Sequence, residues 1–516
     1  MTMIFKSFSS LYFATLLMLL GSGLLSTYLG LRLAETADGL WVGALMTANY
    51  LGLVLGGKLG HRLIARVGHI RAYVACAGIV TAAVLGHGMT ALLPVWLVLR
   101  LVVGLCMMCQ YMVIESWLNE QAGPSQRGKV FAGYMGASYL GLILGQLVLV
   151  VHPELSLELL MMVALCFALC LVPVALTRKL HPAPLHPAPL EMRFFLKRVP
   201  LSLLTIGVAG LLIGSFYGLG PLYGSRMGLS TEQVGLFMGC CILAGLLAQV
   251  PLGWLSDRAD RVKLIRGCAG LLSVTALPLA VLQDAPVELL FACGFAVSIM
   301  LFSLYPLAVA FANDHVESER RVSLTVMLLV VFGVGAAVGP MLVGFLMRFL
   351  GANMLYAFTA LSGLVLVGFV RTAKVTHVHQ VDEAPLHHIA MPEGMASSPL
   401  VAALDPRNEE QYVQEQMCDE HDADCEEELR AAQAEADASA SAAEVELATI
   451  AAAVVTASAV AAAAVAADAD VDTAAYTDGA EPVSTEETVV ASVDSDTQES
   501  SSQDPEQPDS SKDGNA

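Results

Sequence analysis

GWLSDRADRVK, residues 253–263, sets five charged side chains between two long apolar runs. The run before it is VGLFMGCCILAGLLAQVPL (234–252), and the run after it is LIRGCAGLLSVTALPLAVL (264–282). Each run is long enough to cross the hydrocarbon core of a bilayer as a helix, which takes about 20 residues. A short charged turn between two such runs predicts a chain that leaves the membrane here and enters it again.

The composition also indicates a membrane protein. Of the 516 residues, 56% are hydrophobic and 14% are charged, and the mean hydropathy of +0.65 excludes an ordinary soluble globular protein. The charge is segregated, because 32 of the 47 acidic residues but only 4 of the 27 basic residues follow Arg371. Residues 1–371 therefore carry a net charge of +8 and the tail carries −28. The sequence predicts a mildly basic membrane domain followed by an acidic appendage.

Apolar runs of sufficient length occur twelve times before the tail. Helices are the expected form, since open strands cannot satisfy their backbone groups in lipid. The first run is too long for a signal peptide and lacks a small-residue cleavage site, so we expect it to remain as an anchor. The predicted fold class is an all-α integral membrane protein with twelve transmembrane helices, near residues 9–31, 40–58, 72–92, 94–116, 129–151, 157–177, 201–223, 233–255, 264–282, 287–311, 322–347 and 353–370.

The basic residues predict the orientation of these helices. Lys and Arg concentrate on the cytoplasmic side of membrane proteins, and 19 of them fall on one side of the predicted spans against 3 on the other. We therefore expect a multi-pass protein of the plasma (inner) membrane with both termini cytoplasmic.

The longest connection divides the spans six and six, and the prolines of its HPAPL repeat favour an extended spacer. The predicted domains are a six-helix bundle at 1–177, a cytoplasmic central loop at 178–200, a second six-helix bundle at 201–371, and an acidic, Ala-rich, largely disordered cytoplasmic tail at 372–516.

The two halves resemble each other in sequence. At an offset of 192 residues, Val42-Gly43 matches Val234-Gly235 and Arg66 matches Arg258. Two repeated six-helix units are a known architecture of secondary transporters, with the substrate path between the units. The repeat therefore predicts a solute transporter.

The charged loop, as we call residues 253–263, resembles the loop signature that the major facilitator superfamily carries between its second and third spans and again between its eighth and ninth. In that family the loop carboxylate docks against a neighbouring helix and nearby cations, and latches the cytoplasmic side of the two bundles. The resemblance assigns the latch to Gly253, Asp257, Arg258, Arg261 and Lys263, and its first-half copy to Arg66, Gly68 and Arg71. Asp260 replaces the usual glycine, and His61 and Ala65 replace the Gly and Asp of the first copy, so only the second copy can act through a carboxylate.

Other segments are also similar to this family. RLVVG (100–104) is similar to the buried R-x-x-x-G pattern of many proton-driven antiporters. GLILGQ (141–146) lies where drug–proton antiporters carry a Gly-Pro signature, with Gln146 in place of the proline. The set VIESWL (113–118), GYMGASYLGLILGQ (133–146), GSFYGLGPLYG (214–224) and FSLYPLAVAFA (302–312) most resembles the YcaD-like branch. The resemblance covers about residues 10–370 and implies the fold, not the solute.

Two charged residues lie within the fourth predicted span, Arg100 towards its outer end and Glu115 near its inner end. Charges within spans are costly and usually face a cavity or a partner. Fifteen residues separate the two, which is about 22 Å of helix, and the helical period puts them on nearly the same face. We expect both to line a central cavity. The alternatives are an Arg100 that reaches the membrane surface or bonds to carbonyls, and a Glu115 that pairs with Arg127 or Lys129.

Neutral polar groups within the spans complete the expected proton and substrate path. We place Gln110, Tyr217 and Tyr305 beside Arg100 and Glu115, within a wider lining of Ser26, Tyr28, Asn49, Tyr50, Tyr134, Ser138, Gln146, Ser215, Gln249 and Ser303. The small-residue patterns of spans five and eleven are expected to allow close packing of helix backbones, and they comprise Gly141, Gly145, Gly335, Gly339 and Pro340.

Several classes of protein are excluded by what the sequence lacks. No Walker loop, dinucleotide fingerprint or hydrolytic triad is present, so we expect neither an enzyme nor a cofactor, and no nucleic-acid partner. The cysteines behave as small hydrophobes, and Cys106-x-x-Cys109 is expected to pack instead of binding a metal. The driving force should therefore be an ion gradient or the gradient of the solute itself.

The sequence thus predicts a monomeric secondary active transporter in the lipid bilayer, which moves a small organic solute by alternating access, with proton-coupled efflux as the favoured mode. An uptake permease for a small metabolite and a transporter-derived sensor or scaffold with a partner-binding tail are the alternatives. We expect the tail to be dispensable for transport, because a disordered acidic arm adds no buried contacts. Its Ala-rich stretch at 447–467 is expected to be a soluble helix and not a span.

Overall fold

The computed structural model describes residues 2–122, 127–176, 192–282, 286–317, 320–372 and Ser398. The chain separates by its contacts into two units, Met1–Val465 and Ala466–Ala516. The second unit lies outside the described residues, as do nearly all of the predicted acidic tail and most of the predicted central loop. In the described part of the chain all regular secondary structure is helical, as expected for a chain whose backbone must be satisfied in lipid.

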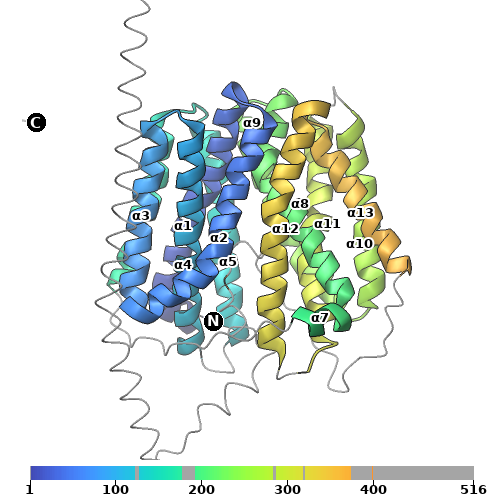
Figure 1. The fold of residues 1–516 in the computed structure, drawn as a ribbon, viewed down its shortest axis with the longest axis horizontal. Helices are drawn as coiled ribbons and strands as arrows, with labels where there is room; N and C mark the ends of the chain where they lie inside the picture. The colour runs from blue at the N-terminus through green and yellow to red at the C-terminus, as the bar shows by residue number, and fades with distance from the viewer. Residues whose placement is uncertain are drawn as a thin grey trace, which may run out of the picture. The chain divides into compact units, whose positions relative to one another are not determined.

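Thirteen helices are described in the first unit (Figure 1). They are α1 (Thr2–Thr36), α2 (Gly39–Val67), α3 (His69–Met89), α4 (Leu93–Gln121), α5 (Arg127–Val151), α6 (Leu157–Ala175), α7 (Met192–Arg198), α8 (Pro200–Arg226), α9 (Thr231–Ser256), α10 (Arg261–Val281), α11 (Val287–Asn313), α12 (Arg321–Leu350) and α13 (Met354–Thr372). The short helix α7 was not predicted, and its Phe195 is fully buried, which anchors the end of the central connection.

Eleven of these helices are long and apolar enough to cross a membrane, and they match the first eleven predicted spans. The twelfth predicted span, 353–370, forms α13, whose apolar part Met354–Val370 is a shorter apolar helix. The structure therefore supports an all-α membrane protein with eleven full-length candidate spans and one shorter apolar helix. That α13 also crosses the membrane stays a prediction.

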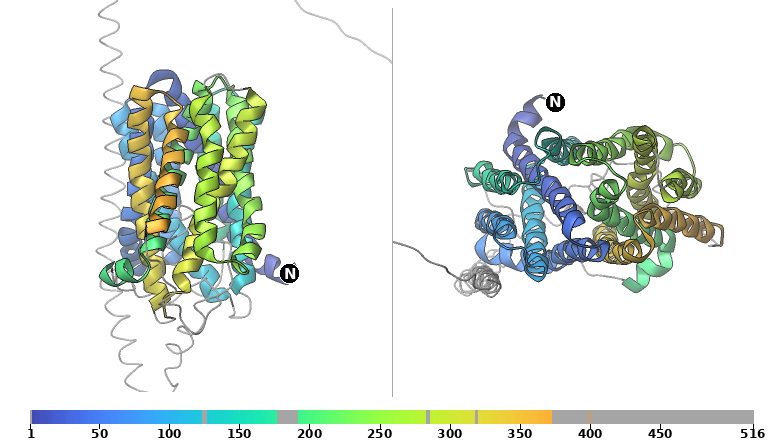
Figure 2. Two further views of the ribbon diagram at one scale, coloured as in Figure 1. Left: turned by 90° about the vertical axis from the view of Figure 1, so that its right-hand side faces the viewer. Right: turned by 90° about the horizontal axis from the view of Figure 1, so that it is seen from above.

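The helices pack as two sets with matching partners. In the amino-terminal set (α1–α6), α1 packs against α5 and α6, and α4 packs against α2 and α3. In the carboxy-terminal set (α8–α13), α8 packs against α12 and α13, and α11 packs against α9 and α10. Figure 1 separates the two sets by colour, and the view from above in Figure 2 shows them side by side. The same pairs recur in both sets, as the sequence repeat implies.

The glycine patterns of α5 and α12 lie at two of these matched contacts, where the helix backbones approach closely. A Cβ atom on Gly141 or Gly145 would stand 2.5 Å from the carbonyl oxygen of Leu16 or Leu20 in α1. The corresponding distances in the other set are 2.4 Å from Gly335 to the Gly207 oxygen and 2.1 Å from Gly339 to the Leu211 oxygen of α8. No side chain fits at such distances, so these positions allow the helix backbones to touch.

The two sets meet through further glycines at one end of the helices. We call the end where α1 begins the inner end, following the predicted orientation, and the opposite end the outer end. Near the outer end, a Cβ on Gly43 of α2 would stand 2.2 Å from the Pro340 oxygen of α12, and one on Gly344 would stand 2.3 Å from the Gly39 oxygen. We call these four residues the outer seam.

Polar contacts flank the outer seam. Thr47 donates a hydrogen bond to the Ala337 carbonyl at 2.7 Å, and Arg348 Nε lies 3.2 Å from Asp38 Oδ2. The second pair of helices between the sets, α5 and α9, is also close near the outer end, where a Cβ on Gly235 would stand 2.9 Å from the Gln146 oxygen. The outer end is thus closed by direct backbone contact between the two sets.

Candidate functional site

The charged loop joins the end of α9 to the start of α10 at the inner end of the carboxy-terminal set. Asp260, which departs from the expected glycine, accepts hydrogen bonds from the backbone nitrogens of Val262 at 2.9 Å and Lys263 at 3.4 Å. It is the N-cap of α10, a position where an aspartate satisfies otherwise unpaired donors. Arg258 lies with its guanidinium 4.2 Å from the centre of the Trp254 ring. The departure from the family pattern therefore serves to start a helix.

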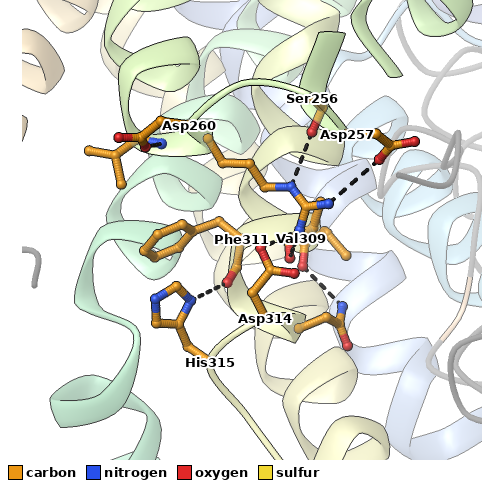
Figure 3. Close-up of polar contacts among 11 residues, drawn as sticks. Ser256, Asp257, Asp260, Val309, Phe311, Asp314 and His315 are labelled. Atoms are coloured by element: carbon orange, nitrogen blue, oxygen red, sulfur yellow. Dashed lines mark hydrogen bonds and ion pairs between the residues drawn. The ribbon is translucent and has the colours of Figure 1, made fainter. Parts of the chain in front are cut away.

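Arg261 makes most of the polar contacts in this region. Figure 3 labels three of its partners, Ser256, Asp257 and Asp314. The residue is only 8% exposed, and its guanidinium contacts both Asp314, at the end of α11, and Asp257. The distance from Arg261 Nη2 to Asp257 Oδ1 is 3.7 Å, and Nη1 also donates to the Ala310 carbonyl at 3.0 Å. Arg261 Nε donates to Ser256 Oγ at 3.2 Å. Arg261 thus connects the charged loop to the ends of α9 and α11 through hydrogen bonds and ion pairs.

The latch residues are therefore arranged differently from the prediction in one respect. We expected Asp257 to be the only carboxylate of the latch, whereas Asp314 contacts Arg261 as well. Sequence reasoning missed Asp314 because it lies 53 residues beyond Arg261, in a segment without a recognisable signature. In the first-half copy, Gly68 has a φ of 83° and joins α2 to α3, a conformation that favours glycine.

We expect Arg261→Gln to lower the stability of the purified protein by about 2 kcal/mol, since it leaves two partly buried carboxylates without their cation. Asp257→Asn should cost less than about 1 kcal/mol, because Arg261 keeps Asp314 as a partner. Arg258→Gln, on the exposed side of the loop, is the matched control. The melting temperatures of the three variants measure these losses of stability. Equal decreases in melting temperature for Asp257→Asn and Arg261→Gln would contradict the prediction.

A cavity lies at the contact between the two sets of helices. Its walls come from α1, α2, α4 and α5 of the amino-terminal set and from α8 of the carboxy-terminal set. Most of the lining is apolar or aromatic, with a few hydroxyl and amide groups. The lining residues are Leu19, Ser22, Gly23, Ser26, Met46, Asn49, Tyr50, Leu53, Met107, Tyr111, Leu142 and Tyr217.

Four members of the predicted polar lining reach this cavity: Ser26, Asn49, Tyr50 and Tyr217. The sequence reasoning missed Ser22 and Tyr111, although Ser22 lies one helical turn before Ser26, a spacing that could have indicated it. Gln110 and Tyr305 do not line the cavity. Both are buried, Gln110 with its Nε2 3.8 Å from Cys170 Sγ and Tyr305 with its ring centre 5.2 Å from that of Phe332.

Arg100 is buried beside the cavity, with 1% of its surface exposed. Its Nη2 atom donates to Ser26 Oγ at 3.1 Å and lies 3.4 Å from Met46 Sδ, and both of these residues line the cavity. Its Nε atom has no hydrogen-bond partner among the described residues. The side chain is buried and does not extend to the protein surface, and no carbonyl oxygen is among its hydrogen-bond partners in the described residues.

Gly104, the fourth residue after Arg100, allows α4 to place this cation next to α1 and α2. A Cβ atom on Gly104 would stand 2.0 Å from the Asn49 oxygen of α2, and one on Gly52 would stand 2.2 Å from the Leu101 oxygen. The glycine of the R-x-x-x-G pattern therefore lets α4 approach α2 closely. This contact sets Arg100 within reach of Ser26 and Met46.

Glu115 is fully buried in the inner half of α4, and it is the only buried acidic residue in the described ranges. The Tyr134 hydroxyl of α5 donates to its Oε1 atom at 2.8 Å. The backbone nitrogen of Ser398 lies 3.0 Å from Oε1 and 2.9 Å from Oε2, and the Ser398 hydroxyl also donates to Oε2. All of these partners donate, an arrangement that suits an ionised carboxylate, which only accepts hydrogen bonds.

The Ser398 contact differs from our expectation for the tail. We predicted that the tail adds no buried contacts, but Ser398 is fully buried and hydrogen-bonded to a residue in the amino-terminal set. The rest of the tail, including the Ala-rich stretch 447–467, lies outside the described residues. One tail residue therefore belongs to the surroundings of Glu115.

Gln146 occupies the position where drug–proton antiporters carry a proline. Its Oε1 atom accepts from Thr27 Oγ1 at 2.8 Å, and its Nε2 atom donates to the Gly23 carbonyl at 3.2 Å. These bonds join α5 to α1 behind the cavity wall. Gln146 therefore provides a polar cross-link between two helices.

Comparison with known proteins agrees with this architecture. The family model described as Major Facilitator Superfamily matches residues 11–300 and 232–408. The uncharacterized MFS-type transporter YcaD of Escherichia coli (strain K12 / DH10B) is 30% identical over 365 residues, which are 69% of this chain and 94% of that protein. The uncharacterized MFS-type transporter Ent638_1421 of Enterobacter sp. (strain 638) is 30% identical over 360 residues, 67% of this chain and 90% of that protein.

Solved structures share the fold at lower identity. The nucleoside transporter NupG superposes with a TM-score of 0.61 at 15% identity, covering 70% of this chain and 97% of that one. A bacterial homolog of the human lysosomal transporter Spinster has a TM-score of 0.61 at 13% identity, covering 73% of this chain and 98% of that one. The D-xylose-proton symporter has a TM-score of 0.57 at 13% identity, covering 77% of this chain and 99% of that one. With the charged loop, the paired helix sets and the cavity at their contact, these matches show that the chain belongs to the Major Facilitator Superfamily, a family of membrane transporters and not of enzymes.

Proposed function

We propose that this protein is a secondary active transporter that exports a small organic solute in exchange for protons. The observation that carries the proposal is the buried carboxyl of Glu115, in the same helix as the cation next to the cavity. Proton-coupled transport requires an internal group that changes charge during the cycle, and in the described part of the chain Glu115 is the buried carboxylate available for it.

Alternating access is supported by the cavity and the outer seam. Both sets of helices contribute to the cavity walls, so a rocking motion of one set against the other would expose it to alternate sides. The glycines of the outer seam give a close contact that such a motion would break and remake. In the proposed cycle, the outer end is closed in the state described here and open in the alternate state.

The export direction is supported by the R-x-x-x-G pattern of Arg100 and Gly104, which is similar to that of proton-driven antiporters. Uptake of a small metabolite is the alternative direction for the same machinery. We further propose that α13 is a twelfth span, that the protein acts as a monomer in the inner membrane, and that both termini are cytoplasmic.

A sensor or scaffold function is a second candidate because of one observation. Ser398 of the tail donates hydrogen bonds to Glu115, so a partner bound to the tail could respond to whether that carboxyl is charged or protonated. In this case the protein would bind a solute without carrying it across the membrane.

Flux in vesicles tests the proposal. Purified protein in liposomes is given a panel of labelled metabolites and drugs, with and without an imposed pH gradient. We expect at least one solute to accumulate against its gradient only when protons flow the opposite way. Accumulation driven by protons moving with the solute would favour uptake, and specific binding without flux would favour the sensor.

Two tail deletions separate Ser398 from the remainder of the tail. Deleting residues 410–516 should leave flux and its pH dependence unchanged, while deleting 380–516 removes Ser398 and its donors to Glu115. Loss of hydrogen bonds to a charged group is worth about 1.5–3 kcal/mol, so the pH profile of flux should differ between the two deletions. Identical pH profiles for the two deletions would mean that the whole tail is dispensable for transport, as predicted from the sequence.

A further inference from the structure

We propose that the cavity binds a small organic anion, a carboxylate on an apolar or aromatic body, and that Arg100 selects its charge. This inference names the substrate class of the proposed transporter and rests on that function. Its starting point is a guanidinium that is almost fully buried and has an incomplete set of partners.

The charge of Arg100 has no counterion in the described structure. Its hydrogen-bond partners are the Ser26 hydroxyl and the Met46 thioether, and both are neutral. The other end of α4 holds Glu115, fifteen residues away and about 22 Å along the helix, too far for an ion pair. A buried charge without a partner is costly, and an arriving anion would offset that cost.

The cavity wall offers further positions for the anionic group. Ser26 connects the guanidinium directly to the cavity, at 3.1 Å from Arg100 Nη2. No Asp or Glu that would repel an anion is among the lining residues in the described part of the chain. Ser22 adds a second hydroxyl one turn away on the same helix. A carboxylate could therefore take its hydrogen bonds from hydroxyl groups while the guanidinium supplies the charge.

The rest of the lining fits an apolar body. Tyr50, Tyr111 and Tyr217 present aromatic rings, and Met46 and Met107 present flexible thioethers. Aromatic and methionine side chains pack well around rings and irregular apolar groups. Aromatic faces also attract cations, but the uncompensated charge of Arg100 opposes a cation at this place. The geometry thus favours an amphipathic monoanion over a neutral sugar or a cationic drug.

Equilibrium binding to the full-length protein in lipid nanodiscs tests this inference. The probes are benzoate, benzamide and benzylammonium, which share their ring and differ in charge, followed by a panel of aliphatic and aromatic monocarboxylates. We expect a monocarboxylate to bind about tenfold to a hundredfold more tightly than its neutral amide, the ratio for one hydrogen bond to a charged group. Benzylammonium should bind most weakly.

The variants assign this preference to Arg100. Arg100→Gln should bind the acid and the amide equally, Arg100→Lys should retain part of the preference, and Ser26→Ala should reduce it. Arg226→Gln, an exposed arginine at the end of α8, removes the same charge elsewhere and should behave as wild type. The melting temperature of empty Arg100→Gln should not fall, since the substitution removes an uncompensated buried charge, and this checks that the variant is folded.

The inference is overturned if the amide or the ammonium probe binds as tightly as the acid, if no monocarboxylate binds, or if Arg100→Gln keeps the preference. These measurements use no gradient, so they are independent of the proposed proton coupling. Binding of a monocarboxylate without proton-driven flux would overturn the proposed function alone, and proton-driven flux of a neutral solute would overturn the inference alone.

Discussion

Replacing Gly43 by alanine should open the outer end of the cavity. The added Cβ would stand 2.2 Å from the backbone oxygen of Pro340 and 2.9 Å from its carbonyl carbon, so α2 and α12 must move apart by more than 1 Å to reach normal contact. Overpacking of a close contact costs about 1–3 kcal/mol. This cost falls only on the state in which the outer seam is closed. The population should therefore shift about fivefold to 150-fold towards the state that is open outside.

Labelling of a single cysteine measures this shift. Ser22→Cys places a reporter in the cavity wall, in a background in which the native cysteines are replaced. A membrane-impermeant thiol reagent added from the outer side should label the reporter at least fivefold faster in Gly43→Ala. Gly344→Ala, whose Cβ would meet the Gly39 oxygen at 2.3 Å, should act in the same way.

The same helix provides the control for this experiment. Gly57 also lies in α2, but a Cβ there has no neighbour within 4 Å. Gly57→Ala should leave labelling unchanged and stabilise the helix slightly, because alanine is the better helix former by about 1 kcal/mol. If labelling in Gly43→Ala equals that in Gly57→Ala, the outer seam is a packing contact without a part in the transport cycle.

Replacing Glu115 by glutamine should abolish the response of transport to a proton gradient while downhill exchange continues. Glutamine keeps the size of the side chain and one acceptor oxygen, which can still accept from the Tyr134 hydroxyl and the Ser398 nitrogen. Its NH2 group replaces the second acceptor oxygen by a donor. It cannot gain or lose a proton. If Glu115 carries the proton, accumulation ratios should fall to about one, whatever the imposed pH difference.

The measurement compares accumulation and counterflow in the same liposomes. Counterflow, which needs no proton gradient, reports whether the variant still binds and carries the solute. Glu158→Gln, an exposed carboxylate in the first turn of α6, is the control and should accumulate as wild type does. Full gradient-driven accumulation by Glu115→Gln would remove this residue from the proton path. Loss of both activities would indicate that Glu115 serves the fold.

Local pattern was enough to predict most of the helices. The apolar runs determined the eleven full-length candidate spans, since burying backbone in lipid leaves few alternatives to a helix. The boundaries were less predictable, as for α4, which continues through Asn119 to Gln121, beyond residue 116 where its predicted span ended. The matched packing of the two sets followed from the repeat of Val42-Gly43 in Val234-Gly235.

The sequence predicted only those site residues that stand out within a single helix. Arg100 and Glu115 are conspicuous because each is a charge in an apolar run. Their partners could not be read in the same way, because Ser26, which contacts Arg100, and Ser398, which contacts Glu115, come from distant segments. The same holds for Asp314, the partner of Arg261. A hydrogen bond between α4 and residue 398 spans 283 positions of sequence, and neither end carries a pattern that refers to the other.

The guanidinium of Arg100, which has no counterion among the described residues, has an electrical consequence for the proposed exporter. A monoanion that leaves a cell with a negative interior moves down the membrane potential and gains about 2.3 kcal/mol per 100 mV, nearly a fiftyfold concentration ratio. A proton that enters in exchange moves down the same potential and contributes the same amount again. Each turnover would then carry two charges in one electrical sense, so export should continue on voltage alone when the pH difference is zero. The cell would need no acidic exterior to keep its interior clear of the solute.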